Sequence, residues 1–184
     1  MIIMPPQVGT LVGQIAKLKG CRVVGIAGGE EKCQHLVSEL GFDAAVDYKK
    51  GNVKTAVRRA APKGVDCYFD NVGGDISNGV IMNMNMYGRI AVCGAITGYN
   101  DTKPVLYPAL QPIMVAFQLK MEGFLVWRWM HQGRWDEGLE QMTKWVEEGK
   151  VKNRETVIEG FENLPLAFIK MLEGKNTGKM IVKA

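Results

Sequence analysis

Hydrophobic and polar residues change their spacing repeatedly along the first two thirds of the chain. Apolar residues at helical spacing predict four helices, at residues 9–19, 30–40, 52–61 and 76–84. Short apolar runs ending in glycine or polar residues predict four strands between and after them, at residues 21–29, 43–48, 64–74 and 88–95. Strands that alternate with helices in this way predict an α/β fold with a doubly wound parallel sheet.

The last third of the chain is less regular. A loop at residues 102–112 leads into a helix near Val115, and the apolar segment MEGFLVW predicts a sixth strand at residues 121–127. Beyond it, the pattern predicts two helices and two short strands, at residues 135–148, 166–172, 155–160 and 178–184. A length of 184 residues fits one main domain with an appendage.

The chain begins with MIIMPPQVGT, in which an apolar start is followed by two prolines and a glycine. Residues 1–4 predict a short piece of a first strand, which is central in a doubly wound sheet. Gly9 suits the close approach of a pyrophosphate and Gly13 suits close packing of helix and sheet, although helix glycines also occur for packing alone. Pro5 and Pro6 stand where a phosphate-binding loop has its glycines, and proline offers no N–H group to a phosphate.

Charge and cysteine content argue against several classes of protein. The net charge is only +4 and runs of basic residues never exceed two, so nucleic-acid binding is not expected. Four cysteines without a metal-binding spacing and only two histidines predict a reduced, metal-free, cytoplasmic protein. No apolar run approaches the length of a membrane span, which needs about 20 residues.

Residues at the carboxyl ends of the predicted strands should share one crevice, where open parallel sheets bind their ligands. The second strand ends in Gly28 and Gly29 rather than in the carboxylate that binds a free ribose 2′-hydroxyl, and Lys32 follows. This arrangement favours a 2′-phosphate and hence NADPH. Alternatively, Lys32 is an ordinary solvated lysine, and Glu30 and Glu31 beside it would repel a phosphate.

Asn71 and Tyr99 follow the fourth and fifth strands, in the segments DNVGG and CGAITGYN. An amide beside two glycines allows a ligand to approach closely, although Asn and Gly are also ordinary turn residues. The phenol of Tyr99 can donate a hydrogen bond to a developing oxyanion. The alternative for Tyr99, and for Tyr48, is a surface tyrosine without a catalytic role.

Five segments resemble one known family. GQIAKLKG, YFDNVGG, GRIAVCGAITGYN, IEGFEN and NTGKMIVKA are similar to the prostaglandin reductases, or leukotriene hydroxydehydrogenases, of the zinc-free medium-chain dehydrogenases/reductases. The resemblance implies an NADP-binding Rossmann domain at residues 1–150 and a C-terminal segment at residues 151–184. In the family, this segment packs on an N-terminal catalytic half that precedes the Rossmann domain. Because Pro5 and Pro6 replace the loop that follows the first strand, we expect the chain to be truncated.

The resemblance also implies the residues of the site. Gly9 would contact the pyrophosphate of NADPH, and Lys32 and Tyr48 would hold its 2′-phosphate. Further matching positions would line the cofactor or the surroundings of its nicotinamide: Asn71, Cys93, Gly94, Ala95, Ile96, Thr97, Gly98, Tyr99, Phe124, Leu125, Val126 and Asn176. Tyr99 would be the catalytic phenol, and no metal is implied.

The family reaction transfers a hydride from NADPH to the β-carbon of an α,β-unsaturated ketone, such as a 15-oxo-prostaglandin or another oxidised lipid. The resemblance therefore implies enone reduction, with Tyr99 stabilising the enolate, by a homodimer joined through the strand at residues 121–127. One alternative is a non-catalytic short product that binds nucleotide weakly or pairs with full-length subunits. A quinone oxidoreductase of the same superfamily fits CGAITGYN and the tail less well.

Overall fold

A computed structural model describes residues 1–3, 8–99 and 108–184. Pro5 and Pro6, on which the interpretation of the N-terminal loop depends, lie outside the described residues. The same is true of the first part of the loop predicted at residues 102–112.

Six parallel strands form the main sheet, in the order β3-β2-β1-β4-β5-β6. They are β1 (Ile2–Ile3), β2 (Val24–Ala27), β3 (Ala44–Asp47), β4 (Val65–Asp70), β5 (Met84–Val92) and β6 (Lys120–Gly123). The order reverses direction between β1 and β4, which confirms the doubly wound parallel sheet predicted from the alternating pattern. The short β1 occupies the central position, because Ile2 pairs with Val24 of β2 and with Tyr68 of β4.

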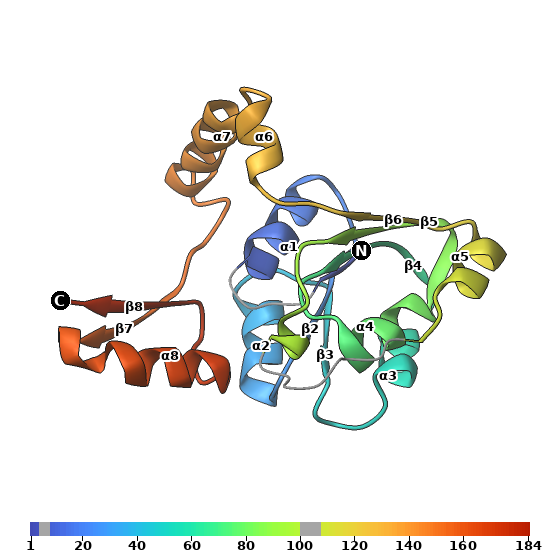
Figure 1. The fold of residues 1–184 in the computed structure, drawn as a ribbon, viewed down its shortest axis with the longest axis horizontal. Helices are drawn as coiled ribbons and strands as arrows, with labels where there is room; N and C mark the ends of the chain where they lie inside the picture. The colour runs from blue at the N-terminus through green and yellow to red at the C-terminus, as the bar shows by residue number, and fades with distance from the viewer. Residues whose placement is uncertain (4–7, 100–107) are drawn as a thin grey trace.

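Helices cover both faces of this sheet (Figure 1). They are α1 (Val8–Leu18), α2 (Glu30–Ser38), α3 (Val53–Ala60), α4 (Gly74–Ile81) and α5 (Gln111–Phe117). One buried cluster joins strand residues such as Ile2 to Val57 of α3 and Val80 of α4, whereas the other joins Ile3 to Ala16 of α1 and Leu36 of α2. The neighbouring isoleucines of β1 thus serve opposite faces, as the period of a strand requires.

Local sequence signals explain several boundaries. Asn52 caps α3 by accepting a hydrogen bond from the backbone N–H of Thr55 at 3.0 Å. Gly20 has a φ of +78° just beyond α1, a conformation that glycine adopts without steric cost. Gly13 faces the ring of Phe42, and a Cβ atom there would overlap that ring. The close packing expected of Gly13 is therefore present.

The structure corrects three of the predicted boundaries. The strand predicted at residues 121–127 covers only β6, since Trp127 already begins helix α6 (Trp127–His131). Its apolar residues form a corner, because the Phe124 ring packs against Phe69 and Trp129 with centroids 6.1 and 5.3 Å apart. The helix predicted at 76–84 ends at Ile81, and β5 begins four residues before the predicted strand at 88–95.

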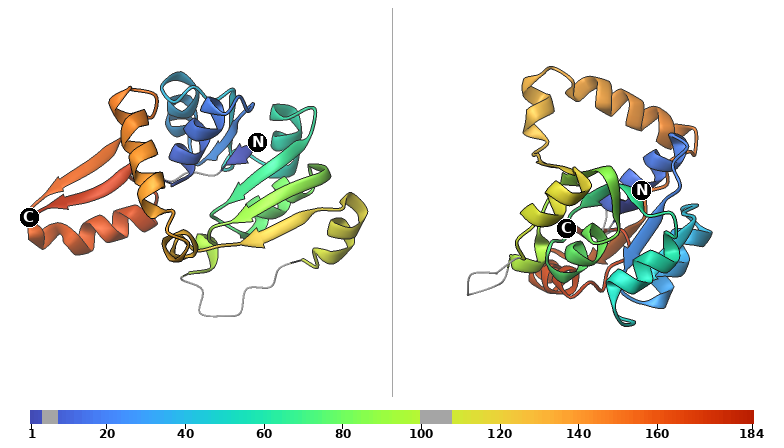
Figure 2. Two further views of the ribbon diagram at one scale, coloured as in Figure 1. Left: turned by 90° about the horizontal axis from the view of Figure 1, so that it is seen from above. Right: turned by 90° about the vertical axis from the view of Figure 1, so that its right-hand side faces the viewer.

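The C-terminal part forms a separate layer. After α7 (Trp135–Glu147), strands β7 (Glu155–Glu159) and β8 (Lys179–Lys183) pair in parallel and are joined through η2 (Phe161–Asn163) and helix α8 (Leu164–Leu172). This layer lies at the α2 end of the molecule, opposite α5 (Figures 1 and 2). The division predicted at residue 150 remains a prediction. Among the described residues, no helix combines the length and apolar character needed to cross a membrane.

Gln14 connects this layer to α1. Its side chain is buried, and its Nε2 donates to the carbonyl oxygen of Lys152 at 2.9 Å. The backbone N–H of Lys152 donates back to Oε1 of Gln14 at 2.7 Å. This paired contact fixes the start of the C-terminal layer beside the main sheet.

Candidate functional site

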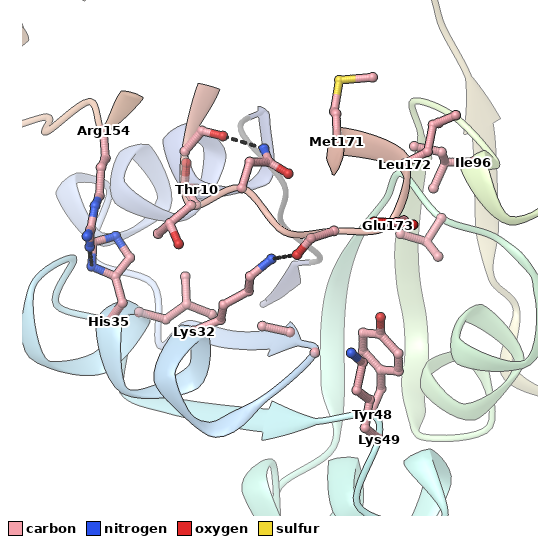
Figure 3. Close-up of a pocket in the computed structure, with 18 of the residues that line it drawn as sticks. Thr10, Lys32, His35, Tyr48, Lys49, Ile96, Arg154, Met171, Leu172 and Glu173 are labelled. Carbon is pink, nitrogen blue, oxygen red and sulfur yellow. Dashed lines mark hydrogen bonds between the residues drawn. The ribbon is translucent and has the colours of Figure 1, made fainter. Parts of the chain in front are cut away.

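A cavity of about 420 Å³ lies between the carboxyl ends of the strands and the C-terminal layer (Figure 3). The sheet side supplies residues from the ends of β2 and β3, from α2, and from the segments after β4 and β5. The other side is formed by residues 152, 154, 171–174 and 176–178. The crevice expected at this edge of the sheet is thus covered by residues of the C-terminal layer.

The floor of the cavity is shaped by Asp47 and Gly28. Oδ1 of Asp47, the last residue of β3, accepts hydrogen bonds from the backbone N–H groups of Gly29 at 2.9 Å and Lys49 at 3.0 Å. The Gly29 hydrogen bond is the main reason that the pKa of the Asp47 carboxyl is lowered. A Cβ atom on Gly28 would lie 2.7 Å from the hydroxyl of Tyr48, so a glycine is needed where β2 ends.

Lys32 projects from α2 into the cavity, and its ammonium donates a hydrogen bond to the carbonyl oxygen of Gly174 (Figure 3). Burial lowers the pKa of Lys32, and the positive charge of Lys49 lowers it further, whereas Glu31 opposes the shift. Because the Lys32 ammonium is partly buried and is repelled by a second positive charge, a bound anion would stabilise its charged form.

The charge of the lining is mostly positive. Among the described lining residues, Lys32, Lys49, Lys152 and Arg154 are cationic, and Glu173 is the only acidic residue. Lys152 and Arg154 already have partners. The ammonium of Lys152 donates to the Glu39 carbonyl oxygen at 3.2 Å, and the Arg154 guanidinium lies 3.4 Å from Nδ1 of His35.

A second group of residues comes together where β4 and β5 end. A Cβ atom on Gly94 would lie 2.9 Å from Oδ1 of Asn71 and 3.1 Å from the hydroxyl of Tyr99, so these three residues are neighbours. The hydroxyl of Thr97 donates to the carbonyl oxygen of Val72 at 2.6 Å and ties this group to the DNVGG turn.

Asp70, which the sequence analysis did not select, organises that turn. It is 3% exposed and accepts hydrogen bonds from the hydroxyls of Tyr68 and Ser77 and from the backbone N–H groups of Val72 and Gly73. All four distances lie between 2.6 and 3.0 Å. A carboxylate as the last residue of a buried strand, directly before NVGG, is the signal by which Asp70 could have been found.

Apart from Gly9, the predicted site residues fall into three sets. Five of them line the cavity: Lys32, Tyr48, Ile96, Thr97 and Asn176. The second set belongs to the neighbouring group after β4 and β5 or to the backbone that connects it: Asn71, Cys93, Gly94, Ala95, Gly98 and Tyr99. Gly9 is buried in the first turn of α1.

The third set consists of Phe124, Leu125 and Val126, at the corner between β6 and α6. Phe124 borders a second cavity of about 480 Å³ along β4, β5 and β6, whereas Leu125 and Val126 are 67% and 48% exposed. The structure therefore does not bring this set to the first cavity. Sequence analysis also missed Lys49, Lys152, Arg154 and His35 in the cavity lining, of which only Lys49 had a signal, its place in DYKK at a strand end.

The family model described as zinc-binding dehydrogenase matches residues 8–144 of this chain. The chain belongs to this family. No cluster of three or more His, Cys, Asp or Glu side chains suited to a metal ion occurs within the described part of the chain. Zinc-free catalysis remains a prediction.

Known proteins of this family include close relatives. Prostaglandin reductase 1 of Mus musculus is 53% identical over 178 residues, which are 96% of this chain and 54% of the relative. A putative NADP-dependent oxidoreductase of Bacillus subtilis, YfmJ, is 45% identical over 96% of this chain and 52% of its own length. The chain thus spans about half the length of these curated relatives, and the resemblance to prostaglandin reductases is confirmed.

A solved structure extends the similarity to the whole arrangement. CurA from Vibrio vulnificus, crystallised in complex with NADPH, is 41% identical to this chain and superposes with a TM-score of 0.93. The match covers 100% of this chain and 56% of CurA. It therefore includes the C-terminal layer as well as the main sheet.

Proposed function

We propose that this chain binds NADPH in the cavity described above and forms the cofactor-binding part of an enone reductase. The reaction is hydride transfer to the carbon–carbon double bond of α,β-unsaturated ketones, including 15-oxo-prostaglandins and related enones. The observation that carries this proposal is the cationic cavity at the ends of β2 and β3, in a chain 53% identical to a prostaglandin reductase. Metal-free catalysis and a cytoplasmic location belong to the same proposal.

The cavity suits the adenosine end of NADPH. No side chain at Gly28 blocks the approach of a ribose, and β2 ends without the carboxylate that would accept a hydrogen bond from a free 2′-hydroxyl. Lys32 and Tyr48 offer an ammonium and a phenol to a 2′-phosphate. The objection that Glu30 repels such a phosphate is weakened, because Glu30 forms an ion pair with Lys50 at 2.7 Å and does not line the cavity.

Tyr99 is the residue of this chain proposed to assist the chemistry. Bound NADPH would supply the hydride. The Tyr99 hydroxyl, held near Asn71 and Gly94, would donate a hydrogen bond to the substrate oxygen that becomes negative in the enolate. Removing one good donor to such an oxyanion typically lowers the rate by about 10² to 10³.

Calorimetric titration of the purified chain with NADPH, with NADH as the matched control, tests the binding step. We expect micromolar affinity for NADPH and a clear preference over NADH. Oxidation of NADPH by a 15-oxo-prostaglandin, followed at 340 nm, then tests the reaction. Absence of NADPH binding contradicts the proposal, and binding without turnover restricts it to the cofactor site.

A second candidate is a chain without activity of its own, which binds nucleotide weakly or pairs with full-length subunits. One observation favours it: the proposed catalytic residue Tyr99 is 68% exposed. The homodimer proposed through residues 121–127 would use β6, the edge strand of the sheet, and belongs to the catalytic proposal as well. Light scattering with size-exclusion chromatography distinguishes monomer from dimer, and reduction of enones by the purified chain alone excludes this candidate.

A further inference from the structure

Three side chains meet where helix α2 touches the first residues of the C-terminal layer, at the edge of the cavity. The side chain of His35 is only 10% exposed, and its Nδ1 atom lies 3.0 Å from Oε1 of Glu39, one turn further along. Arg154, between α7 and β7, reaches the same imidazole from the C-terminal layer (Figure 3). Its Nη1 atom lies 3.4 Å from Nδ1 of His35 and 3.9 Å from the Glu39 carboxylate. One ring nitrogen thus lies between a carboxylate and a guanidinium.

The Nδ1 atom of His35 cannot form hydrogen bonds with both neighbours at once. A guanidinium only donates hydrogen bonds and a carboxylate only accepts them. Without a proton, Nδ1 accepts from Arg154, and with a proton it donates to Glu39. A neutral imidazole can adopt either form, because its one proton can be on either ring nitrogen. An imidazolium always has a proton on Nδ1 and places a positive charge beside the guanidinium, so protonation removes the favourable contact with Arg154.

The charged neighbours of His35 on α2 are the same whether or not the C-terminal layer is in place. Glu31 lies one turn before His35 and Glu39 one turn after it. The hydrogen bond from His35 is the main reason that the pKa of Glu39 is lowered, so Glu39 is negative throughout the range in which an imidazole titrates. Lys32 directs its ammonium to the carbonyl oxygen of Gly174. These groups therefore do not make the charge of His35 depend on the layer.

The C-terminal layer adds two cations at this point. Besides the Arg154 guanidinium, it brings the ammonium of Lys152, which donates to the Glu39 carbonyl oxygen at 3.2 Å. The nearby acids of the layer, Glu155 and Glu173, have hydrogen-bonding or ion-pair partners within the layer. Packing of the layer against α2 therefore adds positive charge beside the imidazole, which opposes a second positive charge on the ring.

We propose that His35 is a proton-sensitive contact between α2 and the C-terminal layer. The layer is held over the cavity when His35 is neutral, and it opens more often when His35 is protonated. Because an imidazole ordinarily changes its charge between about pH 5 and pH 8, mild acid is sufficient. The two hydrogen bonds between Gln14 and the Lys152 backbone do not depend on this proton, so the layer stays attached. The inference goes beyond the proposed function, since it needs no bound nucleotide.

The test follows exchange of the Lys152 amide hydrogen with solvent in the ligand-free full chain. This amide donates to Oε1 of Gln14 across the boundary between α1 and the layer, so its protection reports opening of that boundary. Protection is the observed exchange rate relative to that of a free amide, measured by NMR between about pH 8 and pH 5. Spectra of the imidazole carbons give the titration of His35 in the same samples.

Three variants assign the effect. His35→Gln and Arg154→Met each remove one side of the contact. His131→Gln is the matched control, because His131 is the only other histidine of the sequence and lies in α6, outside the cavity. Amides of β4 and β5 report whether each variant keeps its fold.

We expect protection of the Lys152 amide to fall about threefold from pH 8 to pH 5, an effect typical of two partly exposed charges. Its midpoint should coincide with the titration of the His35 imidazole. The dependence should persist in His131→Gln and disappear in His35→Gln and Arg154→Met. Protection in β4 and β5 should be unaffected by these substitutions.

Other outcomes overturn the inference. Constant protection in the wild-type chain means that His35 does not control the layer. Protection that rises in acid means that attraction between the imidazolium and Glu39 outweighs repulsion from Arg154. An unchanged dependence in His35→Gln assigns the effect to another group, and an unchanged dependence in Arg154→Met excludes the proposed contact. None of these results bears on the proposed function, because no nucleotide is present.

Discussion

The two ends of the candidate site differ in how completely this chain builds them. At the ends of β2 and β3, Gly28, Lys32 and Tyr48 face a cavity that the C-terminal layer covers. We call these residues and the residues that cover them the closed region. At the corner between β6 and α6, Leu125 and Val126 are 67% and 48% exposed. Tyr99, which follows β5, is 68% exposed. We call these three residues the open region. On the proposed binding mode, recognition of the adenosine end of NADPH would depend on contacts within this chain, whereas the residues near the nicotinamide end would be open to solvent.

Asp70→Ala should have the largest effect, because Asp70 supports the turn between the two regions. The substitution leaves two hydroxyls and two backbone N–H groups without their buried acceptor. We expect a loss of about 3 kcal/mol in the free energy of unfolding, measured by urea denaturation. Asp75→Ala, on the neighbouring helix α4, is the control. Equal stability of both variants would mean that Asp70 is dispensable for the turn.

Gly28→Asp should damage the closed region alone. Its Cβ would crowd the Tyr48 hydroxyl, and its carboxylate would face a 2′-phosphate. Two like charges placed side by side in a binding site cost several kcal/mol. The affinity for NADPH should therefore fall about 100-fold or more, with a smaller loss for NADH. Calorimetric titration with both nucleotides measures the difference. A parallel loss for both would indicate steric damage without a charge effect.

Gln14→Leu should loosen the cover of the closed region. Both hydrogen bonds to the Lys152 backbone are lost, while the buried volume is nearly kept. We expect the C-terminal layer to open more easily by about 1–2 kcal/mol, seen as faster amide exchange at residues 152–178. Exchange in β4 and β5 serves as the internal control. Uniformly faster exchange would instead indicate a general loss of stability.

Leu125→Ser tests the open region and should have a small effect. Because Leu125 is largely exposed, the free energy of unfolding should change by less than about 0.5 kcal/mol. Binding of adenosine 2′,5′-bisphosphate should not change at all. A tenfold weaker binding of this ligand would show that the two regions are coupled. Leu36→Ser, on the buried face of α2, is the destabilising reference.

Acid should weaken the hydrogen bonds that the Asp47 carboxylate accepts from the backbone N–H groups of Gly29 and Lys49. Hydrogen bonding to Gly29 lowers the pKa of Asp47, so its stabilising effect is present above the ordinary value of about 3.9 and is lost as pH falls through the lower folded value. The amide signals of Gly29 and Lys49 should titrate together with a midpoint below 3.9 in NMR spectra. In Asp47→Asn this transition should disappear. A midpoint at or above 3.9 would contradict the role of these hydrogen bonds.

Most of the main sheet could be predicted because its signals are local. The alternation of apolar runs and helical stripes marked the successive strand–helix units, and glycines such as Gly20 marked where a helix ends. The strand predicted at residues 121–127 was too long, because β6 ends at Gly123. Its aromatic residues pack in a corner around Phe124, and a run of apolar residues does not reveal whether the backbone turns.

The sequence by itself determined the doubly wound sheet and the edge at which Lys32 and Tyr48 meet, because parallel strands bring their carboxyl ends to the same side. Only the tertiary structure decided that the end of the chain closes this edge. Gln14 meets Lys152 and Lys32 meets Gly174 across 138 and 142 residues of sequence. Such contacts depend on how finished elements pack, and neither the spacing of apolar residues nor a glycine in a turn carries that information.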